Sequence, residues 1–117
     1  MQLKRVVVTG LGALTPIGNN IEEYWNALVN GVSGAAPITH FDASKSKTRF
    51  ACEVKNFNPT DYINRKDARK MDKFTQYAMV ASDEAIADAN LDLEAINKLR
   101  VGVIWGAGIG GLETFQN

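Results

Sequence analysis

The spacing of apolar positions predicts one long helix over residues 65–89. The run contains no proline or glycine, and steps of about 100° per residue place its small, mostly apolar side chains on one face. That face consists of Ala68, Met71, Thr75, Ala78, Ser82, Ala85, Ile86 and Ala89. The opposite side of the first two turns carries the cations Lys66, Arg69, Lys70 and Lys73. We expect the helix to bury its small face and to present the cations to solvent or to an acidic partner.

Two short apolar runs predict buried parallel strands. Residues 5–9 are rich in β-branched side chains, and residues 101–105 are apolar throughout. After the first run, residues 21–29 have the apolar spacing of a helix, with Asn20 as N-cap and Gly31 just past the end. The succession of strand, turn and helix predicts an α/β fold.

The connection between these elements is long and mostly irregular. Within residues 31–58 we expect a short extended piece at 50–54, and Asn58 followed by proline is typical of a helix start. Another helix can begin at Leu112. Because two strands cannot complete a parallel sheet covered on both faces, we expect residues 1–117 to be the N-terminal piece of a longer protein.

The composition is that of an ordinary globular domain, with 45% hydrophobic and 22% charged residues, which argues against disorder. At this length a compact chain buries about two thirds of its unfolded surface. Thirteen basic residues balance thirteen acidic ones, so bulk charge gives no reason to expect nucleic-acid binding. The charges are nevertheless separated along the chain, because residues 45–73 are mainly basic and residues 83–94 are acidic without a basic residue.

The sequence predicts a cytoplasmic protein. Its first residues lack the apolar core of a secretory signal, and no stretch approaches the ~20 apolar residues of a membrane span. Cys52, the single cysteine, has no partner for an internal disulfide.

Isolated residues with reactive side chains favour structural roles. Cys52 lies in an extended run beside Ala51, so we interpret it as a small packing residue. His40, the only histidine, lies in a loop with nothing to pair it with that cysteine. No His, Cys or carboxylate cluster has metal-ligand spacing, and no P-loop motif is present, so the sequence predicts neither a metal nor a cofactor from these residues.

The glycine loop after the second apolar run leaves an alternative open. Gly106, Gly108 and Gly111 match G-x-G-x-x-G, the dinucleotide-binding fingerprint, whose acidic partner is expected ~20 positions further on. An NAD(P)-binding oxidoreductase is therefore one hypothesis. The structural interpretation is that glycines at a strand end let backbone and ligand approach closely.

Five motifs in order resemble the N-terminal part of the β-ketoacyl-[acyl-carrier-protein] synthases. They are VVVTGLGALTPIGNN, ITHFDAS, FACEVKNF, RKDARKMDKFTQYAMVASDEAIADA and VGVIWGAGIGG. The resemblance extends from Val6 to Gly111, and RKMDKF together with the Ile of GAGIGG resembles synthase II more than synthase I. Cys52 stands where relatives usually have glycine.

The resemblance implies an α/β, thiolase-like fold layered α/β/α/β/α, of which residues 1–117 open the first half, and usually a homodimer. It implies fatty-acid elongation, in which a cysteine accepts an acyl chain from acyl carrier protein and malonyl carrier protein loses CO₂ to supply the attacking carbanion. Two histidines stabilise the developing charge. All three residues lie beyond Asn117 in the family pattern, so no catalytic residue and no condensation are expected from these residues alone.

The resemblance also assigns two binding roles. Lys66, Arg69 and Lys70 match the cations that dock the acidic carrier protein, for which a cationic face is suited. Ile109 matches the residue that gates the acyl pocket, next to Gly108. Three hypotheses remain: a condensing enzyme, an NAD(P)-dependent oxidoreductase, and a non-catalytic module that binds acyl carrier protein.

Overall fold

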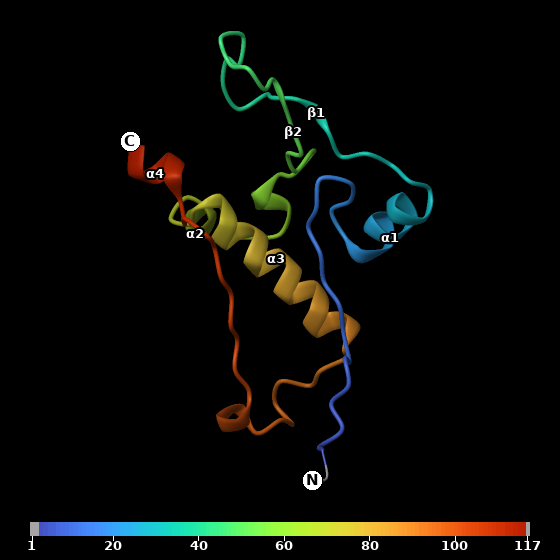
Figure 1. Cartoon of the computed structure of the whole chain (residues 1–117). Helices are drawn as coiled ribbons and strands as arrows, with labels where there is room; N and C mark the ends of the chain where they lie inside the picture. Colours follow the sequence, from blue (N-terminus) through green and yellow to red (C-terminus); the bar gives the residue numbers. More distant parts are fainter. Residues whose placement is uncertain (1–2, 117) are drawn as a thin grey trace.

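The computed structural model describes residues 3–116. Its elements in chain order are α1 (Ile21–Val29), β1 (Ala36–Pro37), β2 (Phe50–Ala51), the 3-10 helix η1 (Pro59–Asp61), α2 (Arg65–Ala68), α3 (Lys73–Asp88), the 3-10 helix η2 (Lys98–Arg100) and α4 (Leu112–Gln116) (Figure 1). In the described range the one sheet is an antiparallel pair in which Ala36 faces Ala51. No helix formed by residues 3–116 is both long and apolar enough to span a membrane.

Helix α1 begins and ends where its capping residues predict. The Asn20 side chain accepts a hydrogen bond from the Glu23 backbone N–H at 2.8 Å, which satisfies one of the unpaired donors of the first turn. At the other end Gly31 has φ +65°, a left-handed conformation that glycine adopts readily. Backbone bonds from Gly31 to Leu28 and from Val32 to Ala27 then close a Schellman motif.

Two carboxylates of α3 hold the turn that leads into α1. The Glu84 carboxylate accepts from the backbone N–H of Ala13 at 2.9 Å and of Ile21 at 2.8 Å. One helical turn further on, Asp88 accepts from the Leu11 N–H at 2.8 Å. Because these donors have no other partner in a turn or at a helix start, the two side chains attach the turn firmly to α3.

The glycines of the same turn allow the backbone to lie directly on the helix. A Cβ atom on Gly10 would come within 2.7 Å of the Ala89 Cβ, and one on Gly12 within 2.8 Å of the Ala85 nitrogen. No side chain fits at either position. The close approach expected of the small helical face is thus confirmed at Ala85 and Ala89.

The expectation that the helix buries the whole of this small face is wrong. The fully buried residues of α2 and α3 are Ala68, Gln76, Val80 and Ala81, and only Ala68 belongs to the expected face. The other members of that face are half-buried. The turn containing Gly12 packs against the helix at both Ala81 and Ala85, which are one turn apart, so the closest packing includes Ala81, a residue outside the expected face.

The single helix expected over residues 65–89 is also wrong, because the chain turns between α2 and α3. Asp72 is extended, with ψ 157°. The buried side-chain amide of Gln76 donates to the carbonyl oxygens of Ala68 at 2.9 Å and Met71 at 3.3 Å. The last carbonyls of a helix have no partner within the helix, and the Gln76 amide supplies a donor to these two, so Gln76 stabilises the break.

The two expected strands do not form. Residues 3–9 and 101–109 follow extended paths that run upward from the lower end of the view in Figure 1, but neither is paired. Their apolar side chains are exposed, with Val6 at 89% and Ile104 at 98%. A strand needs a hydrogen-bonded neighbour, and residues 3–116 supply none to these segments.

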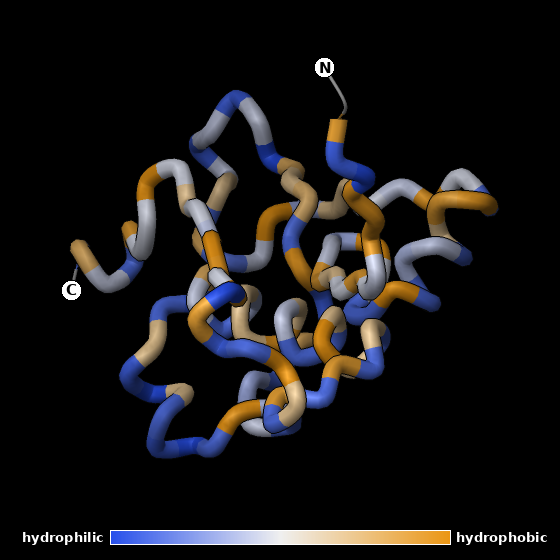
Figure 2. Tube along the Cα trace, turned by 90° about the horizontal axis from the view of Figure 1, so that it is seen from below, coloured by the Kyte–Doolittle hydropathy of each residue, from blue (hydrophilic) through white to orange (hydrophobic). Residues whose placement is uncertain are grey.

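The molecule is therefore open rather than compact. Its accessible surface is 9868 Å², whereas a compact protein of this mass exposes about 6,300 Å². Its radius of gyration is 17.4 Å against about 13 Å for a compact chain. Figure 2 shows hydrophobic stretches along the outer course of the chain, including the part next to the N-terminus. The expected burial of about two thirds of the unfolded surface is not reached.

Candidate functional site

A cationic face lies on α2 and the turn that follows it. We use this name for Lys66, Arg69 and Lys70. Asn64 begins the helix by accepting from the Lys66 N–H at 2.8 Å, and a bond from Lys70 N to Asp67 O at 2.9 Å continues the turn. All three side chains are exposed, and none has an ion-pair or hydrogen-bond partner in the part of the chain that the structure describes. Their charges are therefore available to a partner.

The fourth cation of the expected stripe, Lys73, is engaged elsewhere. It belongs to α3, beyond the break, and its ammonium lies 3.1 Å from the Glu113 carboxylate and 3.3 Å from Nδ1 of His40. The expected stripe of four cations on one helix is thus reduced to the three of the cationic face. Lys73 instead joins the start of α3 to α4.

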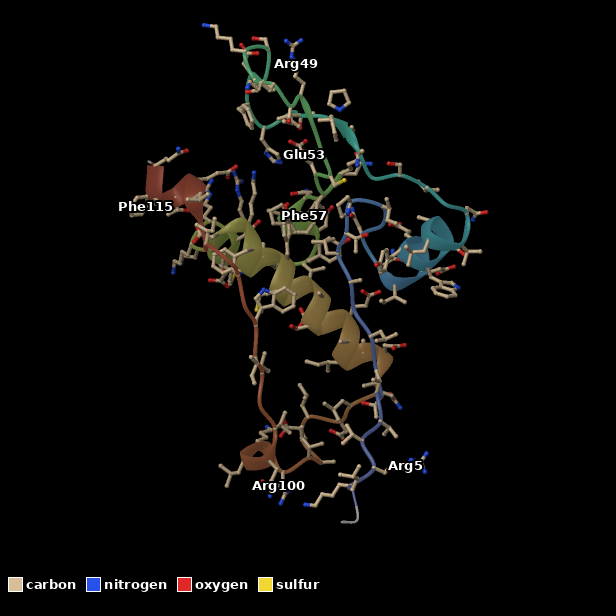
Figure 3. All side chains as sticks on the ribbon, in the orientation of Figure 1. Arg5, Arg49, Glu53, Phe57, Arg100 and Phe115 are labelled. Atoms are coloured by element: carbon tan, nitrogen blue, oxygen red, sulfur yellow. The ribbon has the colours of Figure 1, made fainter. Side chains whose placement is uncertain are left out.

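His40 lies in a small polar cluster between the β1–β2 connection and α4. Its ring nitrogens are 3.8 Å from Glu53 and 3.9 Å from Glu113. Glu53, labelled in Figure 3, accepts from the Thr39 hydroxyl at 2.7 Å and from the Thr39 N–H at 3.2 Å. The bond from the Thr39 hydroxyl is the main cause that lowers the pKa of Glu53 below its ordinary 4.5. This arrangement supports the structural role expected of His40.

The expected packing role of Cys52 is wrong. The side chain is exposed, so in the described chain it fills no core position. It follows β2 directly, and side chains at neighbouring strand positions point to opposite faces. The half-buried neighbour Ala51 takes the inward position, which leaves Cys52 on the outside.

A pocket of about 370 Å³ is lined on one side by the start of α3 and on the other by residues 110–114. Tyr77 lines it, and burial raises the pKa of this phenol above its ordinary value. Ile109, expected in an acyl pocket, is not among the lining residues, and its side chain is 77% exposed. The structure therefore brings the loop close to α3 without enclosing Ile109.

The glycine loop has two different ends. A Cβ atom on Gly106 or Gly108 would meet nothing within 4 Å, so this end is unsupported within residues 3–116. At the other end Gly110 has φ +80°, and a Cβ atom on Gly111 would lie 2.7 Å from Oδ1 of Asp72. A carboxylate against the third glycine of the fingerprint would repel a pyrophosphate. The unpaired run before the loop also lacks the strand that the fingerprint requires.

Asp72 is the site residue that the sequence analysis missed. It occupies the N-cap position of α3, yet its side chain makes no capping bond and accepts a hydrogen bond from the Thr114 hydroxyl. The signal available in the sequence was an aspartate directly before a helical run, but this pattern predicts a local cap rather than a contact with a distant residue.

The comparison with known families defines the class. The family model for the N-terminal domain of beta-ketoacyl synthases matches residues 3–117. The chain belongs to the beta-ketoacyl synthase family. This membership removes the oxidoreductase hypothesis, which rested on the glycine pattern alone.

Particular relatives are similar over nearly the whole chain. The 3-oxoacyl-[acyl-carrier-protein] synthase 2 of Synechocystis sp. (strain ATCC 27184 / PCC 6803 / Kazusa) is 49% identical over 117 residues, which are 100% of this chain and 28% of the relative. The protein of the same name from Staphylococcus aureus (strain COL) is 50% identical over 115 residues, or 98% of this chain and 28% of the relative. The chain thus spans about 28% of the length of these relatives.

Two solved structures share the fold. The ishigamide ketosynthase/chain length factor matches with a TM-score of 0.70 and 38% identity over 78% of this chain and 23% of its own. A type II polyketide ketosynthase in complex with its acyl-carrier protein matches with a TM-score of 0.62 and 27% identity over 82% of this chain and 25% of its own. The fold is therefore that of a ketosynthase over most of the chain.

Proposed function

We propose that residues 1–117 form the opening part of the first half of a 3-oxoacyl-[acyl-carrier-protein] synthase that elongates fatty acids. We call the protein of which they are this part the complete synthase. The proposal is supported by the family match and by the identity of about 50% to relatives of that name. The family resemblance adds the layered thiolase-like fold and a homodimer, and the sequence features described above add a cytoplasmic location. In such a fold, residues 3–9 and 101–105 become strands once neighbouring strands pair with them.

The chemistry in this proposal is a decarboxylative condensation. A cysteine thiolate attacks the thioester of an acyl carrier protein, forms a new thioester and releases the carrier thiol. The bond between malonyl carbon and carboxylate then breaks to give CO₂, and the resulting carbanion attacks the acyl-enzyme and expels the thiolate. The family pattern places the cysteine and two histidines beyond Asn117. Residues 1–117 would contribute carrier binding and part of the wall of the acyl pocket.

The single observation that carries the proposal, beyond the family match, is the state of the cationic face. Its three side chains are exposed and lack partners among residues 3–116, whereas the neighbouring Lys73 is neutralised by Glu113. Three cations without an ion-pair partner among the described residues are thus left on α2 and the turn that follows it. Carrier proteins are acidic, so the face is suited to steering and orienting them.

Ile109 and Gly108 complete the proposed site. Ile109 is an apolar side chain among glycines, and Gly108 leaves open space beside it. An apolar chain can pack against such a side chain, and the absence of neighbouring Cβ atoms lets it change position without collisions. We propose that these two residues line the path of the acyl chain.

The test reverses charges in the complete synthase. Lys66→Glu, Arg69→Glu and Lys70→Glu should each lower kcat/KM for an acyl carrier protein by about fivefold at low salt, since each charge is worth about 1 kcal/mol, and added salt should shrink the effect. Acylation by a small acyl thioester, which needs no docking, should not change. The matched control reverses Lys45, Lys47 and Arg49, two lysines and one arginine in the connection between β1 and β2.

Three results would contradict parts of the proposal. Equal losses with carrier-bound and small thioesters would make the cationic face structural. Equal losses in the control would make the effect one of total charge. A wild-type protein that binds carrier but is acylated by neither substrate would be the non-catalytic carrier-binding module.

A further inference from the structure

We propose that the contact between Asp72 and Thr114 positions the loop that carries Ile109, and so joins the cationic face to the acyl path. The inference rests on the proposed function for the role of Ile109, but the contact itself does not. Asp72 and Thr114 are positioning residues in this proposal, because they act on the loop and not on the substrate.

The first observation is how the Asp72 carboxylate is used. An aspartate at an N-cap normally accepts from backbone N–H groups of its own first turn. The Asp72 backbone oxygen accepts the ordinary first helical bonds, from the N–H groups of Thr75 and Gln76 at 3.0 Å each. The side chain makes no capping bond and accepts from the Thr114 hydroxyl, 42 residues away in sequence. The carboxylate thus makes a tertiary contact in place of a local cap.

The second observation is that the chain around this contact is attached at three neighbouring points. Gly111 lies so close to the Asp72 carboxylate that a Cβ atom would come within 2.7 Å of Oδ1. The next residue of α3, Lys73, binds the Glu113 carboxylate at 3.1 Å. Residues 111–114 are therefore held by two consecutive residues at the start of α3.

The third observation is that the preceding part of the loop has no such support. Residues 101–110 are all exposed, and Cβ atoms on Gly106 and Gly108 would touch nothing within 4 Å. Ile109 lies two residues before Gly111, with Gly110 at φ +80° between them. Among the described contacts, the attachment of residues 111–114 to the start of α3 is therefore the nearest one that holds the loop carrying Ile109.

The same attachment is adjacent to the cationic face. Lys70 precedes Asp72 by two residues, and the Gln76 amide fixes the intervening corner through Ala68 and Met71. A carrier protein bound to the cationic face would therefore contact a short, hydrogen-bonded corner that ends at Asp72. In this proposal, a chain of contacts through Asp72 and Thr114 joins the surface that docks the carrier to Ile109, the residue proposed to line the acyl path.

The experiment uses Thr114→Val in the complete synthase, because it removes the hydroxyl and leaves Asp72 and the start of α3 intact. Loss of one hydrogen bond should change the ratio of kcat/KM for long and short acyl carrier proteins by about fivefold, in favour of long chains, since a less constrained Ile109 restricts them less. Amide hydrogen exchange should quicken at Phe115, whose N–H donates to the Gly111 carbonyl at 3.1 Å. Ile109→Phe, which adds volume at the loop, should shift the ratio toward short chains.

Two comparisons separate positioning from general damage. Asp72→Asn keeps an oxygen acceptor for Thr114 and should retain the wild-type ratio, whereas Asp72→Ala should reproduce Thr114→Val, and the double variant should add little to either. Thr48→Val makes the same chemical change in the connection between β1 and β2. Its hydroxyl has no partner in the described chain, and we expect no effect there.

The outcomes also separate this inference from the proposed function. An unchanged ratio and unchanged exchange in Thr114→Val, with normal acylation by short chains, would overturn the positioning role and leave the proposed function standing. If no thioester acylates the wild type, the proposed function fails. Hydrogen exchange then still decides the contact: faster exchange in Thr114→Val supports it, and unchanged exchange rejects it.

Discussion

Two regions of the molecule differ in how fully their backbone groups are paired and their apolar side chains are buried. The first is α3 with the turn before α1, and the second is the pair of extended apolar segments. Three backbone donors of residues 10–21 are satisfied by Glu84 and Asp88, and this turn lies directly on the helix through glycines. Residues 3–9 and 101–109 are equally apolar in sequence but unpaired and exposed. The difference follows from the backbone: a helix satisfies its own hydrogen bonds, whereas a strand depends on a neighbour.

The largest expected effect comes from disturbing the completed region. In the complete synthase, Gly12→Val should lower the free energy of unfolding by about 3 kcal/mol, because its Cβ would overlap the backbone of Ala81 and Ala85. Thermal unfolding measures the loss. Gly31→Asn is the control, since Gly31 faces open space and asparagine tolerates a positive φ. Equal stability of Gly12→Val and wild type would mean that the turn does not pack on α3.

A smaller effect is expected at the corner between α2 and α3. Gln76→Leu keeps the buried volume but removes one of the two donors to the Ala68 carbonyl and a donor to the Met71 carbonyl, which should cost about 1–3 kcal/mol. Chemical denaturation of the complete synthase gives the value. Gln116→Leu makes the same change at an exposed position of α4 and should stay within about 0.5 kcal/mol of wild type. Similar losses of unfolding free energy in both variants would show that the Gln76 hydrogen bonds do not stabilise the break between α2 and α3.

The smallest effect concerns protonation near the β1–β2 connection. Thr39→Val removes the hydrogen bond that chiefly lowers the pKa of Glu53, so this pKa should rise toward 4.5. A depressed carboxyl pKa stabilises the fold above the unfolded-state pKa, and the contribution disappears as pH falls through the folded-state pKa. The variant should therefore lose local order at a higher pH than wild type.

Carboxyl NMR titration would measure the change at Glu53 directly. Asp42 provides an internal reference, because its pKa is lowered mainly by the backbone N–H of Ser44 and should not respond to Thr39→Val. A Glu53 titration identical in variant and wild type would show that the Thr39 hydroxyl is not the cause of the shift.

Local signals in the sequence predicted the local features of the fold. Asn20 and Gly31 set the ends of α1, and Asn58 capped a turn, although that turn is the short 3-10 helix η1. The break at Asp72 was not predictable, because it depends on a buried amide that reaches back to two carbonyls. Apolar content could not reveal whether residues 101–105 have a partner, since pairing is a property of the neighbour.

At the candidate site, too, local sequence predicted the exposed positions but not the contacts between distant residues. Helical spacing predicted an exposed surface formed by Lys66, Arg69 and Lys70, and the structure confirms that all three are exposed, on α2 and its following turn. Helical spacing also included Lys73, but its pairing with Glu113 joins residues 40 positions apart and leaves no trace in local sequence. The roles in carrier docking and in the acyl path remain predictions for the experiments described above.

The most direct test of the contrast between complete and incomplete regions is thermal unfolding of residues 1–117 as a separate chain, with its association state measured alongside. Ala68, Val80 and Ala81 are the fully buried apolar residues of the described chain, too few to offset the entropy of ordering it. We predict an aggregated or molten species without a cooperative transition. A soluble monomer with a sharp, cooperative transition would contradict the account, because the two exposed segments would then need no partner strands.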